Sequence, residues 1–415
     1  MVAYLLCMAT GMSQGFPEGF SWGTATAAHQ IEGGNTNNDW WRFEHTPGTM
    51  ASTSSGDATD SYHRWEQDAD IIAALGFDNY RFSIEWSRIE PADGEFSQAA
   101  LDHYARVCEG LRERGIDPVV TFHHFTTPIW MADKGGWQNP EIADRFATYV
   151  EKAATRLNGL MTKACTINEP NMVAFVGHVL GAFPPGLSEP VSILDEINPI
   201  FVDAHRKGVD AIRSSAAGTP VGITVACTEW EVVESDDPAE AGMAGERTKA
   251  SQAFMEDVFF DAAFAADGTP DDFLGIQTYS RTRMGAHGAL GSEEGVESLI
   301  MGYEYWPQSL EATLRRAWDH TGGRVPLLVT ENGIGTNDDE QRIRYVREAL
   351  EGVLRALADG IDVRGYTYWS LLDNFEWAFG YEPRFGIVEV DRTTFERTPK
   401  PSSAWLSEVI ASNSL

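Results

Sequence analysis

The stretch KACTINEPN at residues 163–171 joins a short apolar run to a polar end, and this combination decides the fold. Residues 163–168 have the length and composition of a buried β-strand, and Asn168 and Glu169 stand where that strand should end. Similar apolar, β-branched or aromatic runs occur at residues 20–26, 79–84, 117–122, 221–227, 273–279, 326–331 and 363–370. The sequence therefore predicts eight strands.

Stretches with helical periodicity alternate with these strands, at residues 62–75, 99–114, 142–157, 201–214, 245–264, 309–320, 339–358 and 404–411. Eight strand–helix pairs with no obvious edge strand predict an α/β fold, a single closed (β/α)8 TIM barrel. The alternative is an open doubly wound sheet, which normally has a Gly-rich phosphate loop after an early strand. Neither GxGxxG nor GxxxxGK[ST] occurs, so we favour the barrel.

The chain reads as one domain. Its 415 residues would allow two or three domains by length alone, but no linker rich in Pro, Ser or Gly divides it. We expect residues 12–415 to form the single barrel domain. Residues 1–11 are expected to be a non-native or disordered extension, because Met12 opens a segment that resembles a natural protein start.

The charge of the chain excludes several classes of partner. With 31 Lys and Arg residues against 62 Asp and Glu residues, the formal net charge is −31, which repels nucleic acid and anionic membrane surfaces. Adaptation to salt would explain this acidity. A GC-rich genome would explain why only six of the basic residues are lysines, but not the acid excess.

The four cysteines, Cys7, Cys108, Cys165 and Cys227, include no CxxC pair, so we expect reduced thiols and a cytoplasmic location. We expect no signal peptide and no membrane span, because the first twelve residues carry no positively charged segment and no small-residue cleavage site, and are too short to span a bilayer. We expect no cofactor and no metal. His123 and His124 are adjacent in a predicted strand, where neighbours point to opposite faces and cannot share one ion. A homo-oligomer is left open.

Polar residues cluster at the ends of six predicted strands. In a (β/α)8 barrel the catalytic groups lie at the carboxyl ends of the strands, so these residues should meet at one face. They are Arg81 and Glu85, His123 and His124, Asn168 and Glu169, Tyr279, Glu331 and Asn332, and Trp369.

Two of these residues, Glu169 and Glu331, form a candidate catalytic pair. Each follows an apolar run, and each has an Asn neighbour. Cleavage of a glycosidic bond needs one protonated carboxyl group and one ionised carboxylate. Burial beside another carboxylate raises one pKa, and a nearby arginine such as Arg81 lowers the other.

Four long motifs resemble glycoside hydrolase family 1, the β-glucosidase family of retaining (β/α)8 enzymes. They are FPEGFSWGTATAAHQIEGG at 16–34, TINEP at 166–170, TENG at 330–333 and YWSLLDNFEWAFGYEPRFG at 368–386. They occur in the order of the family, and the resemblance covers residues 16 to about 405.

The resemblance implies a role for each motif residue. It makes Glu331 the nucleophile and Glu169 the general acid/base, with Arg81 and Tyr279 supporting the nucleophile. A glycone pocket is implied in which Asn168 binds the 2-hydroxyl and Glu376 binds the 4- and 6-hydroxyls. The full implied substrate-binding set is Gln30, His124, Asn168, Gln277, Trp369, Glu376, Trp377 and Phe385, with Tyr303 on the aglycone side.

The implied activity is that of an exo-acting retaining β-glucosidase, whose partner is a small β-glucoside. Glu376 favours unphosphorylated sugars, because a carboxylate there would repel a 6-phosphate. Two departures from the family pattern, Gln277 for Asn and Phe125 for Trp, leave β-galactosidase and β-fucosidase activity open. A third, Tyr303 for Trp, leaves the aglycone preference open. We expect a relatively open aglycone site. A non-catalytic sugar-binding barrel is the remaining alternative.

Overall fold

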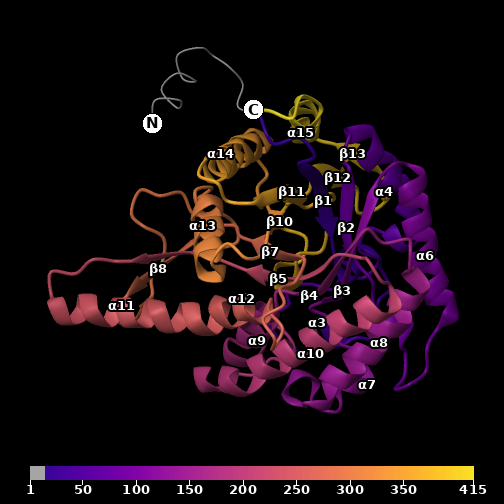
Figure 1. Cartoon of the computed structure of the whole chain (residues 1–415), viewed down its shortest axis with the longest axis horizontal. Coiled ribbons are helices and arrows are strands. Elements are labelled where there is room, and N and C mark those ends of the chain that lie inside the picture. Colours follow the sequence, from indigo (N-terminus) through magenta and orange to yellow (C-terminus); the bar gives the residue numbers. More distant parts are fainter. Residues whose placement is uncertain (1–14) are drawn as a thin grey trace.

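The computed structural model describes residues 15–415 and contains a closed barrel of eight parallel strands (Figure 1). Around the barrel the strands follow the order β1-β11-β10-β7-β5-β4-β3-β2, and β11 pairs with β1 to close it. Their bounds are β1 Ser21–Thr26, β2 Asn79–Ser83, β3 Asp117–His124, β4 Lys163–Asn168, β5 Val221–Ala226, β7 Phe273–Gln277, β10 Leu327–Asn332 and β11 Val363–Trp369. The predicted single (β/α)8 barrel is confirmed, and every predicted strand is present.

Helices lie outside the barrel and cover its strands (Figure 1). The longer ones are α4 Ser61–Leu75, α6 Gln98–Glu113, α8 Glu141–Leu157, α10 Leu194–Ser215, α11 Pro238–Gln252, α13 Ser309–Thr321, α14 Asp339–Ala358 and α15 Pro401–Ser412. Short helices follow several strands, namely α2 Ala28–Ile31, α3 Asp39–Glu44, α5 Trp86–Ile89, α7 Ile129–Ala132, α9 Pro170–Ala174 and α12 Val258–Ala262. Single turns are η1 Gly136–Gln138, η2 Phe175–Val179, η3 Val191–Ile193, η4 Ala253–Asp257 and η5 Trp377–Phe379.

Two helix predictions differ from the structure. The helix expected at 201–214 begins earlier, at Leu194, and includes Pro199 in its second turn. The helix expected at 245–264 is split into α11, the π-helical turn η4 and α12. Only Ala244 and Thr248 are buried in α11, so that helix has no apolar stripe from which its start could be read.

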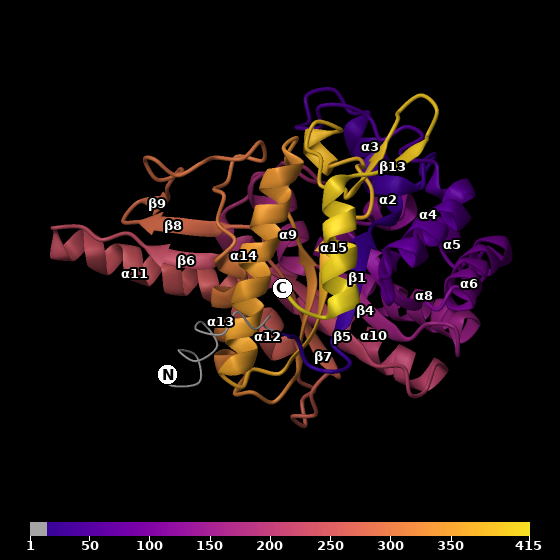
Figure 2. The same cartoon turned by 90° about the horizontal axis from the view of Figure 1, so that it is seen from above.

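Small sheets outside the barrel were not predicted. Strands β6 Glu229–Val232, β8 Arg281–Gly285 and β9 Gly288–Ala289 form a three-stranded sheet. Together with α11 it extends to one side of the barrel (Figure 2). Strands β12 Val388–Val390 and β13 Arg397–Pro399 form a second, two-stranded sheet. Strands this short carry too few residues for an alternating pattern to stand out.

The first and last described residues lie together. The Phe16 amide donates to the Asn413 carbonyl at 2.9 Å, and Gly15 pairs with Ser414. The expectation that residues 1–11 form a non-native or disordered extension falls outside the described residues. None of the helices between residues 15 and 415 is long and apolar enough to cross a membrane.

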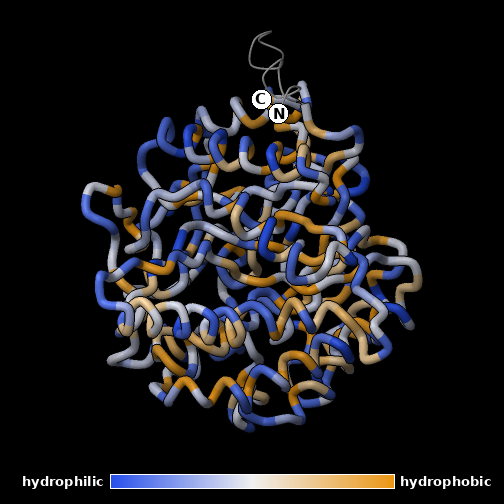
Figure 3. The backbone as a smooth tube through the Cα atoms, turned by 60° about the vertical axis from the view of Figure 1, so that its left-hand side comes forward, coloured by the Kyte–Doolittle hydropathy of each residue, from blue (hydrophilic) through white to orange (hydrophobic). Residues whose placement is uncertain are grey.

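Apolar segments run through the middle of the molecule, and hydrophilic segments are frequent along its outline (Figure 3). Inside the barrel, a small apolar layer of Val119, Cys165 and Phe273 packs with Leu328 near the amino-terminal ends of the strands. A polar layer lies beyond it, toward the carboxyl ends, and includes Arg81, which is 1% exposed. The barrel interior therefore changes from apolar to polar toward the face where the βα loops gather.

A buried ion pair attaches the β12–β13 sheet to the helix layer. Arg397 Nε on β13 lies 2.9 Å from Asp68 Oδ1 on α4, and their side chains are 0% and 4% exposed. Arg397→Leu should lower the free energy of unfolding by about 3–5 kcal/mol, because it leaves the buried Asp68 carboxylate without a cation and with only the Ser61 hydroxyl as donor. Denaturant titration measures this loss. Arg364→Leu breaks an exposed pair with Asp362 and should cost less than about 1 kcal/mol; equal losses in both variants would contradict the prediction.

Candidate active site

Glu331, at the carboxyl end of β10, is held at both oxygens. Arg81 Nη1 on β2 donates to its Oε1 at 2.6 Å, and the Tyr279 hydroxyl donates to its Oε2 at 2.6 Å. Burial raises the pKa of Glu331, while Arg81 and Tyr279 oppose that rise because both stabilise the ionised form. Of the two carboxyl groups in the predicted pair, Glu331 is the one whose hydrogen bonds favour the ionised form.

Glu169 is in the opposite situation. It follows β4 directly, is 7% exposed, and receives no side-chain or backbone hydrogen bond at its carboxyl group from the described residues. Burial and the neighbouring Glu331 charge raise its pKa well above the usual value. Its φ of 45° is in the left-handed region, a strained conformation that costs about 1–3 kcal/mol. Its amide donates to the Thr224 carbonyl at 2.9 Å, and Pro170 then begins α9.

Arg81 connects Glu331 to two further strands. Its Nη2 donates to the Asn168 side-chain oxygen on β4 and, at 3.3 Å, to the Thr224 hydroxyl on β5. Gln277 Nε2 on β7 donates to the same Asn168 oxygen at 3.1 Å. With its oxygen so occupied, Asn168 directs its amide nitrogen to His124 Nε2, at 3.2 Å. Nε2 of His124 is then an acceptor, so Nδ1 carries the proton.

Glu376 forms the second acidic corner of the site. It is 8% exposed, and Gln30 Nε2 donates to it at 3.3 Å as well as to the Phe375 carbonyl at 2.8 Å. Burial and the Glu331 charge raise the pKa of Glu376 to about 8, with Gln30 and Trp369 opposing the rise. A pKa this close to neutral means that a bound group near Glu376 can change its protonation state.

Aromatic side chains build one wall. The Trp377 ring packs against Trp40 at 4.6 Å, Phe125 at 5.0 Å and His29 at 5.8 Å between centroids. Trp369 stacks on His124 at 5.7 Å. Phe125, where the family usually has Trp, thus contributes to the wall only by packing.

Several polar atoms of this site have no partner in the protein. Gln30 Oε1, Gln277 Oε1 and His124 Nδ1 are buried and form no hydrogen bond with the described residues. Burying a polar group without a partner costs free energy, so such atoms call for a ligand or water. Two acceptors and one donor beside a carboxylate match the hydroxyl groups of a neutral sugar.

The structure brings the predicted site residues together at the carboxyl ends of the strands. Phe385 packs edge-on against Tyr279 at 5.8 Å. Tyr303 is half-buried, and it is near enough for the charge of Glu376 to contribute to the raised pKa of its hydroxyl, which is due mainly to burial.

Three polar residues at strand ends do not join the site. Asn332 is buried, donates to the Thr278 carbonyl at 2.8 Å and accepts from the Tyr366 hydroxyl at 2.9 Å. Glu85 is buried, and its carboxylate accepts hydrogen bonds from Asn35 at 2.7 Å and from Thr126 at 3.0 Å. His123 is buried against Trp137 on the other side of the sheet from His124. Among residues 15–415 no group of three or more His, Cys, Asp or Glu side chains is placed to hold a metal ion.

His29 and Thr224 take part in the site but were not predicted. His29 supports Trp377 from behind and is held by Asn38 at Nδ1 and by Glu44 at Nε2. It is adjacent to Gln30 in the first motif, which is the one signal that could have identified it. Thr224 lies within an apolar strand, where a single hydroxyl gives no signal.

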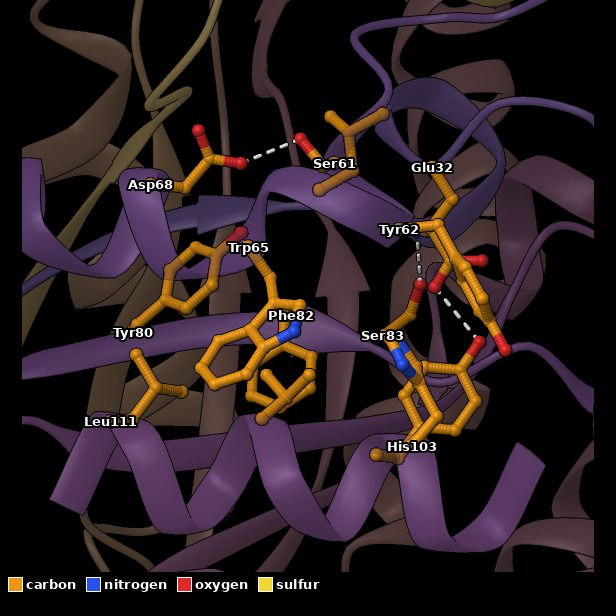
Figure 4. Close-up of a pocket in the computed structure, with 14 residues that line it drawn as sticks. Glu32, Ser61, Tyr62, Trp65, Asp68, Tyr80, Phe82, Ser83, His103 and Leu111 are labelled. Carbon is orange, nitrogen blue, oxygen red and sulfur yellow. Dashed lines mark hydrogen bonds between the residues drawn. The ribbon is translucent and has the colours of Figure 1, made fainter. Parts of the chain in front are cut away.

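A cavity outside the barrel is separate from this site (Figure 4). It lies between the helices α2, α4 and α6 and the strand β2, and its volume of about 30 Å³ has room for little more than water. Its carboxylates are satisfied within the protein. Glu32 accepts from Arg88 and from the Tyr104 hydroxyl, each at 2.8 Å, and Asp68 pairs with Arg397. We therefore regard this cavity as structural.

Comparison with known proteins identifies the family. The sequence profile of glycosyl hydrolase family 1 matches residues 12–283 and 272–415. β-Glucosidase A of Acetivibrio thermocellus is 34% identical, over 96% of this chain and 98% of its own length. A bifunctional β-D-glucosidase/β-D-fucosidase of Bifidobacterium breve is also 34% identical, over 97% of this chain and all of its own length.

A solved structure supports the same assignment. A β-glycosidase crystal structure superimposes with a TM-score of 0.87 and 42% sequence identity, over 96% of this chain and 98% of that chain. These matches set aside the non-catalytic alternative and confirm the resemblance carried by the four motifs. The chain belongs to glycosyl hydrolase family 1 and is a glycosidase.

Proposed function

We propose that the protein is an exo-acting retaining β-glucosidase in which Glu331 is the nucleophile and Glu169 the general acid/base. The observation that carries this assignment is the unequal environment of the two carboxyl groups. Arg81 and Tyr279 hold Glu331 ionised, and Glu169, with no donor and a pKa well above its usual value, stays protonated. A retaining glycosidase needs this division of states.

The reaction proceeds in two steps. Glu331 attacks the anomeric carbon, forming a glycosyl–enzyme ester, while Glu169 gives its proton to the departing glycosidic oxygen. Once the Glu331 charge is consumed in the ester, the repulsion that raised the pKa of Glu169 disappears. Glu169 then becomes the base that deprotonates water for the second step.

The glycone is bound by the neutral and acidic groups around the pair. Asn168, oriented by Arg81 and Gln277, holds the 2-hydroxyl group. Gln30 and His124 bind the 3- and 4-hydroxyl groups through atoms that lack partners in the free protein. Glu376 binds the 4- and 6-hydroxyl groups. Trp369 lies under the sugar ring, and Trp377 donates a hydrogen bond to the sugar. Phe385 lies at the edge of the glycone pocket, and Tyr303 lies on the aglycone side.

β-Fucosidase activity is a second candidate, with β-galactosidase activity beside it. The similarity to a bifunctional β-D-glucosidase/β-D-fucosidase favours it. Glu376, which we assign to the 4- and 6-hydroxyls, is the residue that would distinguish a glucoside from a fucoside, because a fucoside lacks the 6-hydroxyl group. Which β-glycoside is preferred depends on this residue.

Azide rescue tests the two catalytic roles. With an aryl β-glucoside as substrate, Glu169→Ala plus azide should form the β-glucosyl azide, because azide attacks the intact ester on Glu331. Glu331→Ala plus azide should form the α-glucosyl azide, because azide replaces the missing nucleophile. Without azide, loss of general acid–base catalysis at Glu169 should lower kcat about 10²–10⁴-fold for poor leaving groups. NMR of the anomeric proton identifies each product.

The exposed carboxylate of Glu151 provides a control, and Glu151→Ala should behave like the wild type. Identical azide anomers from the two active-site variants would overturn the assignment. So would a Glu331→Ala enzyme that keeps the wild-type rate.

The pH dependence of kcat/KM tests whether the Tyr279 hydroxyl stabilises the ionised form of Glu331. Tyr279→Phe removes a hydrogen bond that stabilises the ionised carboxylate, so the pKa of Glu331 rises and the acid limb of kcat/KM moves to higher pH. The alkaline limb, set by deprotonation of Glu169, should move less. Tyr80→Phe, which removes a buried hydroxyl paired with Thr26 on the outer side of the barrel, should leave both limbs in place. An unmoved acid limb in Tyr279→Phe would contradict the role.

The sugar preference can be tested at Glu376. Glu376→Gln should lower kcat/KM for an aryl β-glucoside about 10–100-fold, as expected for a charged hydrogen bond worth about 1.5–3 kcal/mol. The matching β-fucoside, which lacks the 6-hydroxyl, should lose less. Glu396→Gln changes an exposed carboxylate and serves as the control. Equal losses on both substrates would show that Glu376 does not read the 6-hydroxyl.

A further inference from the structure

A second cavity lies on the same face of the barrel as the proposed active site. Three βα loops form it, and they contribute residues 297–300, residues 335–337 and the pair Glu382 and Arg384. Its volume is about 140 Å³. Phe385 stands between this cavity and the proposed catalytic residues. One side of its ring packs so closely on Gly335, which lines the cavity, that a Cβ atom there would lie 2.9 Å from the ring. The ring also contacts Tyr279 in the proposed active site. The cavity is therefore a neighbour of the active site and not part of it.

Arg342 fixes the floor of this cavity. It lies on α14, is 1% exposed, and its guanidinium donates to the carbonyls of two of the loops. Those bonds run to Ile334 and Thr336 at 2.8 Å, and to Arg384 and Phe385 at 3.0 Å. Both loops are thus held in place by one buried cation.

Gln341, also on α14, attaches the third loop. Its Nε2 donates to Glu297 Oε1 at 2.6 Å, and its Oε1 accepts from the Thr336 hydroxyl at 2.6 Å. All three loops are therefore ordered before any ligand binds. A preorganised pocket loses little conformational entropy on binding, which favours a specific ligand.

The side chains around the cavity combine planar polar groups with an apolar edge. Asn337 and Glu382 make no hydrogen bond or ion pair with other described residues, and Arg384 uses only Nη1, toward Glu389. An amide, a carboxylate and a guanidinium each present two polar atoms in one plane, which suits the neighbouring hydroxyl groups of a sugar. Ile300, 41% exposed, offers an apolar surface to the C–H face of a ring.

Size and charge narrow the ligand class. At about 140 Å³ the cavity is close in volume to one that encloses a benzene ring. Asn337, Glu382 and Arg384 are exposed at its rim, so the cavity can take the ring of one pyranose with its hydroxyl groups at that rim. Two carboxylates, Glu297 and Glu382, against one guanidinium disfavour an anion. We propose that this cavity is a binding site for one neutral hexopyranose unit. That unit comes either from a free sugar or from the far end of an oligosaccharide; the second source rests on the proposed function.

Paired variants test the proposal on the full-length protein. Asn337→Ala combined with Glu382→Ala removes the two unpartnered side chains, and neither residue belongs to the catalytic machinery. Glu113→Ala combined with Asn158→Ala makes the same chemical changes at exposed positions near the ends of α6 and α8, at the opposite end of the barrel. Thermal unfolding of both double variants should match the wild type.

Two measurements separate the sources of the sugar. For a free sugar, calorimetric titration with glucose should show two binding events in the wild type and the control, and one in the cavity variant. For an oligosaccharide, kcat/KM for cellotriose and cellotetraose should fall at least tenfold in the cavity variant, with an aryl β-glucoside unaffected. Either result supports the proposal.

If glucose binds once to every protein and the oligosaccharide rates do not change, the proposal is overturned. Failure of the proposed function would look different, because the wild type would then not hydrolyse aryl β-glucosides. The glucose titration remains informative in that case, since it does not require turnover.

Discussion

The ion pair between Arg81 and Glu331 is the interaction on which the site depends. Both side chains are nearly fully buried inside the barrel, where an unpaired charge would be very costly. Arg81 is stabilised by three hydrogen-bond acceptors, Asn168 on β4, Thr224 on β5 and Glu331 on β10. One buried cation therefore holds three strands in register and keeps the proposed nucleophile ionised.

The same arrangement leaves Glu169 without a donor, which is why we propose it as the protonated partner. Arg81 uses its donors on Glu331, Asn168 and Thr224, and none of them reaches the carboxyl group of Glu169. Low-dielectric surroundings and the neighbouring negative charge then favour the neutral acid. Two chemically identical side chains thus have the different surroundings on which their proposed roles rest, because one guanidinium is placed asymmetrically between them. The strained backbone at Glu169 shows that its position is imposed by the flanking strand and helix.

The elements that the sequence predicts well are those that bury a continuous apolar face. Strand β4 and helix α14 have the predicted bounds, because their burial imposes a clear period on the residues. The sheet of β6, β8 and β9 escaped prediction because its strands are short and half-exposed. His29 likewise supports Trp377 through a contact between distant segments, and no local pattern indicates such a contact.

The sequence by itself determined the barrel, the order of its strands along the chain, and the pair Glu169 and Glu331, since apolar runs that end in polar residues are local patterns. Only the tertiary structure decided which carboxyl group accepts hydrogen bonds from Arg81 and Tyr279, because those donors reach it across the barrel. It likewise decided that Gln30, Gln277 and His124 present unpartnered atoms, and that Arg342 clamps two loops into a second cavity. Hydrogen bonding and electrostatic coupling act over a few ångströms in space, whatever the separation along the chain.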